Sequence, residues 1–157
     1  MTTDQTVHIE GVPYDHADAV ALRTAMIAEV SDLYAELRDE VGDARANRID
    51  PESVVVALLG RVDDHPVAHA FVRRLEEDLE IKRLFVVPDL RGRGTADALM
   101  SALLSEVRDR GAARVILHTG DRQIAAVRMY GRHGFTPIPV YDPYKDVPGS
   151  LCFEKVL

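Results

Sequence analysis

Residues 84–96 join a buried strand to a helix through a turn with two glycines, and this strand–turn–helix unit restricts the fold more than any other feature. The segment reads Leu-Phe-Val-Val-Pro-Asp-Leu-Arg-Gly-Arg-Gly-Thr-Ala. Glycines let the backbone approach a ligand closely, and the free N–H groups of a helix's first turn attract anions. Arg91 and Arg93 add positive charge suited to phosphate oxygens. The segment therefore predicts a phosphate-bearing ligand at residues 91–96.

The two glycines do not complete either of the familiar nucleotide-binding loops. The chain has no G-x-x-x-x-G-K-[ST] sequence, and Asp97 stands where G-x-G-x-x-G would place its third glycine. The missing glycine disfavours a nucleotide-binding oxidoreductase. A glycine pair after a strand also occurs in turns that bind nothing, so a purely structural role stays open on this feature alone.

Hydrophobic periodicity predicts strands and helices in alternation along the chain. The expected strands cover residues 7–13, 53–61, 66–74, 78–87, 114–119 and 150–157. The expected helices are one long or two consecutive helices within residues 18–42, followed by helices over 96–107 and 123–133. Residues 43–53 are expected to form a loop, and the proline-rich residues 137–148 a stiff loop over a site.

The order of these elements predicts a single α/β domain over residues 1–157, written β-α-α-β-β-β-α-β-α-β-β. Three successive strands joined by hairpins form an antiparallel meander, and the strand–helix–strand crossover that follows makes the fourth and fifth strands parallel neighbours.

The composition is that of a globular domain with an acidic half and a basic half. The 157 residues are 46% hydrophobic, and the formal net charge is −7. Residues 1–80 carry 18 acidic and 7 basic side chains, whereas residues 81–157 carry 8 and 12. The net charge argues against a nucleic-acid backbone as partner, and the basic half, which contains the glycine turn, favours a smaller anion. Unevenly distributed solvated charge is the simpler alternative.

Membrane and secretory patterns are missing from the sequence. The longest apolar run, residues 54–59, is far shorter than the roughly 20 residues of a membrane-spanning helix. Cys152 is the only cysteine, which excludes an intrachain disulfide and a CxxC zinc site. We therefore expect a cytoplasmic protein with no membrane partner.

Two motifs resemble the GNAT superfamily of N-acetyltransferases. Residues 87–88 (Val-Pro) with 91–96 (Arg-Gly-Arg-Gly-Thr-Ala) resemble its acetyl-CoA signature, [QR]-x-x-G-x-[GA]. Residues 126–135 (Ala-Val-Arg-Met-Tyr-Gly-Arg-His-Gly-Phe) are similar to its second motif. The strand 80–86 and the ending 151–157 are similar to a bacterial small-molecule branch. Departures are Gln123, where many members carry asparagine, and Thr95, which replaces a branched aliphatic residue.

The resemblance implies a mixed sheet that splays at its fourth and fifth strands, with acetyl-CoA as co-substrate in the gap. Pantetheine would bond to the main chain of residues 85–87 like an added strand, and the pyrophosphate would sit on N–H groups of residues 92–96. A backbone N–H near Val86 would polarise the thioester carbonyl. The implied acetyl-CoA-binding residues are Phe85, Val86, Val87, Arg91, Gly92, Arg93, Gly94, Thr95, Ala96, Gln123 and Tyr130.

The implied reaction transfers an acetyl group to the primary amine of a small molecule, amino acid or peptide by direct attack in a ternary complex. Glu80 is the candidate base, acting directly or through water, and Tyr130 the candidate acid toward the CoA sulfur. Two alternatives stay open: an ordinary ion pair of Glu80 with Lys82 or Arg73, and a core-packing role for Tyr130. The alternative function is a non-catalytic acyl-CoA-binding or regulatory domain of the same fold.

The acceptor is less well defined by the sequence. The acidic first half favours a cationic amine. The region around Tyr34 shapes the acceptor pocket in similar proteins, so the resemblance implies that Tyr34 reaches this pocket, and packing in the core is the simpler alternative. His65 and His69 lie four residues apart, but Pro66 and a strand pattern intervene, so no metal is expected. Similar proteins often dimerise, and the sequence leaves a homodimer open.

Overall fold

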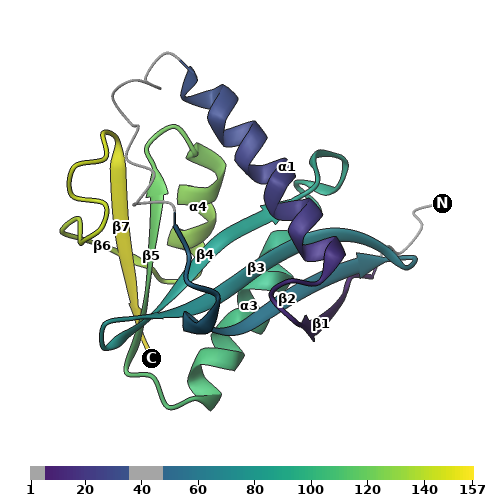
Figure 1. The fold of residues 1–157 in the computed structure, drawn as a ribbon, viewed down its shortest axis with the longest axis horizontal. Coiled ribbons are helices and arrows are strands. Elements are labelled where there is room, and N and C mark those ends of the chain that lie inside the picture. The colour runs from purple at the N-terminus through teal and green to yellow at the C-terminus, as the bar shows by residue number, and fades with distance from the viewer. Residues whose placement is uncertain (1–5, 36–47) are drawn as a thin grey trace.

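The computed structural model describes residues 6–35 and 48–157, which form a seven-stranded sheet with helices on both faces (Figure 1). The strands are β1 (His8–Val12), β2 (Val54–Val62), β3 (His65–Leu75), β4 (Asp78–Val86), β5 (Arg114–Gly120), β6 (Thr136–Ile138) and β7 (Ser150–Val156). The helices are α1 (Ala17–Leu33), α3 (Thr95–Asp109) and α4 (Ile124–Arg132), with short 3-10 turns η2 (Pro51–Ser53) and η3 (Pro88–Leu90). The spatial order β1-β2-β3-β4-β5-β7-β6 confirms the predicted α/β mixed sheet.

Strands β2, β3 and β4 form the predicted antiparallel meander, and β1 pairs antiparallel with β2 at the edge of the sheet. The β2–β3 hairpin turns at Asp63 and Asp64, with φ angles of 49° and 64°, and the β3–β4 hairpin turns at Glu76, with φ 54°. Aspartate tolerates this left-handed region better than most residues, which explains why the acidic pair marks the first turn. The meander supplies one wall of the site, β4.

The fourth and fifth strands are parallel neighbours over a short distance only, and this confirms the predicted splay. Three residue pairs join them: Leu79 with Val115, Glu80 with Ile116, and Ile81 with Leu117. In the described structure, β4 residues after Ile81 form no pairs with β5. A register shift against β3 and a φ of 58° at Arg83 mark a bulge just beyond the last pair. Bulges bend the strand that carries them, so β4 diverges from β5 there.

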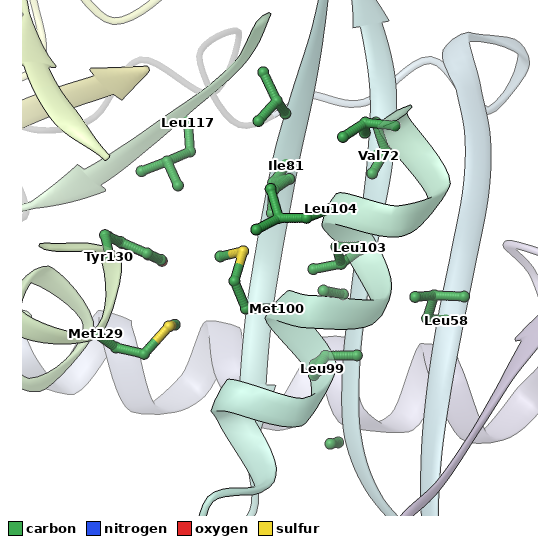
Figure 2. Packing of buried hydrophobic residues seen from close by; sticks show 14 of the residues in the cluster. Leu58, Val72, Ile81, Leu99, Met100, Leu103, Leu104, Leu117, Met129 and Tyr130 are labelled. Carbon is green, nitrogen blue, oxygen red and sulfur yellow. The ribbon is translucent and has the colours of Figure 1, made fainter. Parts of the chain in front are cut away.

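The two faces of the sheet are covered by different helices. Because side chains alternate along a strand, Leu58 of β2 joins the large core cluster with α3, whereas Leu59 packs with Leu22 of α1. Figure 2 shows Met100 of α3 pointing toward Met129 and Tyr130 of α4, so α3 and α4 share the larger core. The splayed gap therefore has α1 on one side of the sheet and α4 on the other.

The extent of the first helix and the proline-rich segment before β7 need comparison with the sequence-based expectation. The first helix ends at Leu33, and the predicted continuation through Leu37, Val41 and Gly42 lies outside the described residues. The proline-rich segment contains a short strand, β6, which pairs with β7 at the edge of the sheet, where a proline is tolerated. No helix within residues 6–35 and 48–157 is long and apolar enough to cross a membrane.

Candidate active site

The splayed gap holds a cavity of about 490 Å³, within the range of small-molecule sites. Its walls come from α1, the bulged part of β4, the end of β5, the start of α4 and the loop before β7. The residues that line it are Met26, Ile27, Val30, Ser31, Tyr34, Ile81, Lys82, Arg83, Leu84, His118, Thr119, Gly120, Gln123, Tyr130, Tyr144, Val147, Pro148, Gly149 and Ser150.

The glycine turn that follows β4 leaves open space beside the start of α3. Gly92 and Gly94 have φ angles of 76° and 85°, and a Cβ atom added at either would meet no heavy atom within 4 Å. Gly94 occupies the N-cap position of α3, and no side chain caps that helix end. Arg93 is exposed, whereas Thr95 is buried. The turn therefore has open space for an anionic group beside the positive end of the helix dipole of α3.

Arg91 connects this turn to α1. Its Nε donates to the carbonyl of Val86 over 2.9 Å, and its two terminal nitrogens donate to the Glu29 carboxylate over 2.7 and 2.6 Å. The hydrogen bond from Arg91 lowers the pKa of Glu29, which keeps the pair charged. An anion bound at the turn therefore competes with Glu29 for Arg91.

The backbone of β4 presents polar groups to the gap beyond the last β5 pair. The N–H of Val87 donates to the carbonyl of Val67 in β3 over 2.9 Å. Successive backbone N–H groups of a strand point to opposite edges, so the N–H of Val86 points away from β3, toward the gap. Phe85 is buried against α1 through Leu22. The strand edge at residue 86 has the direction needed to pair with an extended ligand.

Tyr130 lies in α4 with its ring packed at centroid distances of 5.9 Å from Phe135 and 6.2 Å from Phe153. It is buried yet lines the cavity, and burial rather than a hydrogen bond from a described residue accounts for its pKa. Burial raises the pKa of Tyr130 to about 12, so the hydroxyl stays protonated at neutral pH. Gln123, at the N-cap position of α4, lines the same cavity.

Glu80 is fully buried and does not line the cavity. Its Oε1 accepts from Arg73 Nε over 2.7 Å, and its Oε2 accepts from the Tyr141 hydroxyl over 2.5 Å. The Tyr144 hydroxyl donates weakly to Oε1 over 3.4 Å and itself accepts from Lys82 Nζ over 2.5 Å. The ion pair with Arg73, left open as an alternative from the sequence, is present, and Tyr144 stands between Glu80 and the cavity.

Sequence reasoning missed the two tyrosines of the loop before β7 as members of this cluster. Tyr144 is almost fully buried, and its ring stacks on His118 at a centroid distance of 3.8 Å and an interplanar angle of 5°. Burial and the nearby charge of Lys82 lower the pKa of His118 to about 3, so its ring is neutral. The usable signal was two tyrosines three residues apart in a proline-rich stretch, a composition that suits a fixed wall better than a solvated loop.

Residues 21–135 match the Acetyltransferase (GNAT) family, which covers well over half of the chain. The chain belongs to the GNAT acetyltransferase family. Among curated relatives of this GNAT chain, mycothiol acetyltransferase of Cellulomonas flavigena is 41% identical over 96% of the chain and 50% of its own length. The IAA acetyltransferase of Azospirillum brasilense is 35% identical over 50% of the chain and 51% of its own length. The chain spans about half the length of these relatives.

Solved structures agree with the fold of this GNAT chain. A protein assigned as an acyl-CoA N-acyltransferase from Klebsiella pneumoniae superposes with a TM-score of 0.79 and 27% identity over 98% of this chain and 99% of its own. A GNAT family acetyltransferase from Elizabethkingia anophelis, solved with acetyl-CoA bound, gives a TM-score of 0.71 at 13% identity over 99% and 100%. These structures therefore share the fold of this chain over nearly its whole length.

Proposed function

We propose that this GNAT chain transfers the acetyl group of acetyl-CoA to the primary amine of a small molecule, an amino acid or a peptide. The observation that carries the proposal is the cavity between β4 and β5, because it lies where β4 diverges from β5 after their last pair and Tyr130 lines it. The acetyl-CoA-bound Elizabethkingia neighbour of the same fold supports acetyl-CoA as the co-substrate.

The residues present fit the parts of acetyl-CoA. The open turn at Gly92 and Gly94, with the first N–H groups of α3, suits a pyrophosphate. The Val86 N–H suits an extended chain that carries amides and a thioester carbonyl. We therefore propose that residues 91–96, Gln123 and Tyr130 bind acetyl-CoA, as expected from the sequence.

The reaction forms a bond between the acceptor nitrogen and the acetyl carbon and breaks the carbon–sulfur bond. The nitrogen loses a proton, and the sulfur gains one. We assign Tyr130 to the sulfur, as a hydrogen-bond donor to the charge that develops there. With a pKa of about 12 it is a weaker acid than an ordinary thiol, of pKa about 8.5. Hydrogen-bond donation to the thiolate is therefore favoured over complete proton transfer, and the CoA thiolate takes its proton from water.

Glu80 can act as the base only if another group passes the proton from the acceptor amine to its carboxylate. Its carboxylate does not line the cavity, so we assign the relay to Tyr144, a residue of the cavity lining whose hydroxyl donates to Glu80. Direct removal of a proton from a bound amine by the carboxylate is disfavoured by the two short hydrogen bonds from Arg73 and Tyr141.

The test is an assay of the purified chain with acetyl-CoA and a panel of primary amines. The proposal predicts release of the CoA thiol together with an acetylated amine identified by mass spectrometry. Acetyl-CoA binding without transfer to any amine would instead favour the non-catalytic acyl-CoA-binding domain. Absence of acetyl-CoA binding would contradict both functions.

A further inference from the structure

The described wall of the cavity is positively charged. Lys82 and Arg83, consecutive residues at the bulge of β4, both line it. Among the described residues that line the cavity, there is no aspartate or glutamate. His118 does not alter the balance, because burial lowers its pKa to about 3 and leaves it neutral. A molecule in this cavity therefore meets positive charge from β4.

Lys82 is a buried cation with hydrogen-bonding capacity to spare. The residue is 8% exposed, and its Nζ donates to the Tyr144 hydroxyl over 2.5 Å. An ammonium has three N–H donors, and no other described residue accepts from it. Burial lowers the pKa of Lys82 to about 8, so most of the population is charged at pH 7. A buried cation with unused donors is stabilised by an anion within contact.

The charge of Glu80 raises the pKa of Lys82 and partly offsets the effect of burial, but Lys82 makes its hydrogen bond to Tyr144 rather than to Glu80. Its two oxygens accept short hydrogen bonds from Arg73 and Tyr141. The Tyr144 side chain lies between Glu80 and Lys82, bonded to both. The Glu80 carboxylate is thus hydrogen-bonded to its buried neighbours and does not line the cavity, whereas Lys82 does.

Much of the rest of the wall is apolar. The apolar side chains come from α1, the bulge and the loop before β7: Met26, Ile27, Val30, Leu84, Val147 and Pro148. The tyrosine rings of Tyr34, Tyr130 and Tyr144 add aromatic surface. An occupant that suits both parts of the wall carries an anionic group and an apolar group.

We propose that the acetyl acceptor is an amine that also carries a carboxylate and an apolar group, such as an apolar amino acid, and that Lys82 and Arg83 bind its carboxylate. This inference rests on the proposed acetyl transfer and specifies its acceptor. This acceptor differs from the cationic amine that the acidic first half of the chain favoured. The same positive charges disfavour the ammonium form of the acceptor, which promotes the neutral amine that attacks the thioester.

The test compares matched acceptors that differ in one group, with CoA thiol release as the readout. L-phenylalanine and L-leucine are paired with L-phenylalaninamide and L-leucinamide, and phenethylamine serves as the amine without either group. The amides have the less basic amines and are more easily deprotonated, so a preference for the acids must come from binding. We expect kcat/KM for each acid to exceed that of its amide by about tenfold or more.

Variants then locate the source of the preference. Lys82→Met and Arg83→Met keep long side chains but remove the charges, and each is expected to lower the ratio of kcat/KM for the acids to kcat/KM for the amides by about tenfold. Lys155→Met, on β7 and outside the cavity lining, is the matched control and leaves the ratio unchanged. Circular dichroism establishes that each variant is folded, and the acid–amide comparison in the wild type needs no variant.

Failure of this inference differs from failure of the proposed function. Acetylation of amides or phenethylamine at rates equal to or above those of the acids overturns the carboxylate site and leaves acetyl transfer intact. An unchanged acid-to-amide ratio in both β4 variants overturns the roles of Lys82 and Arg83. Acetyl-CoA binding with no transfer to any amine overturns the proposed function, and this inference with it.

Discussion

Arg73 donates from Nε to Oε1 of Glu80 over 2.7 Å, and both side chains are buried. Arg73 also donates to the Tyr144 hydroxyl over 3.1 Å, so the ion pair holds the wall residue that separates Glu80 from the cavity. A buried pair of this kind has two separable effects, one on stability and one on the site.

Glu80→Gln removes the counter-charge of Arg73 and is expected to reduce the free energy of unfolding by about 3 kcal/mol or more, because it leaves a buried cation unpaired. Urea denaturation measures this loss. A variant as stable as the wild type would contradict the buried ion pair.

The double variant Arg73→Met with Glu80→Gln removes both charges and is expected to recover much of that stability. Turnover then separates the two roles of Glu80. If Glu80 accepts the proton through Tyr144, kcat stays low in the stable double variant. Recovery of kcat along with stability would assign Glu80 to structure alone.

Tyr130→Phe keeps the ring contacts with Phe135 and Phe153 and removes the hydroxyl. We expect kcat to fall by about a hundredfold or more, with the Kd for acetyl-CoA nearly unchanged. Steady-state kinetics and calorimetric titration measure the two quantities. An unchanged kcat would remove Tyr130 from the mechanism and leave it as a core residue.

Gly92→Ala and Gly94→Ala are expected to weaken acetyl-CoA binding, because each adds a methyl group to the open turn and strains a backbone with positive φ. Gly111→Ala is the matched control: its φ is 75°, an added Cβ meets nothing within 4 Å, and it lies beyond the other end of α3. All three should lose about 1–2 kcal/mol of stability, measured by urea denaturation. Equal loss of acetyl-CoA affinity in the Gly111 variant would show that strain, rather than the site, is responsible.

His69 predicts an acid-sensitive contribution to stability. Burial lowers its pKa from 6.5 to about 4 in the folded protein. Its ring nitrogens lie 2.8 Å from the Leu58 carbonyl and 2.9 Å from Arg23, so the neutral ring donates from Nδ1 and accepts at Nε2. The unfolded chain binds the proton first as pH falls, so this stability is complete above pH 6.5 and is lost between pH 6.5 and 4.

Urea denaturation of wild type and His69→Gln from pH 7 to pH 4 measures that contribution. The free energy of unfolding should fall less steeply with acid in the variant. Parallel curves would show that His69 does not titrate differently in the folded and unfolded chains.

The strand–turn–helix unit was predictable because local residues determine it, whereas the splay was implied by the resemblance to the GNAT superfamily. A glycine turn after a buried strand has few conformations, and the observed φ angles of Gly92 and Gly94 are the ones that favour glycine. The crossover helix with its apolar stripe of Leu99, Met100 and Leu103 packs on the sheet as expected. Short-range patterns of this kind translate directly into backbone geometry.

The Glu80 cluster was not predictable because its members come together only through tertiary structure. Tyr141 and Tyr144 lie about 60 positions from Glu80 in the sequence. Arg91 illustrates the same limit, since its position in the motif indicated a ligand contact, whereas its partner in the structure is Glu29. Long-range pairing of polar side chains depends on where the elements pack, which periodicity does not report.

Hydrogen exchange of the chain with and without acetyl-CoA tests the location of the co-substrate site most directly. The account predicts slower amide exchange in peptides that cover residues 85–96 and 119–130, with β1 (His8–Val12) unchanged. Saturating acetyl-CoA that leaves both regions unprotected, or protects only segments elsewhere, would contradict an acetyl-CoA site between β4 and β5.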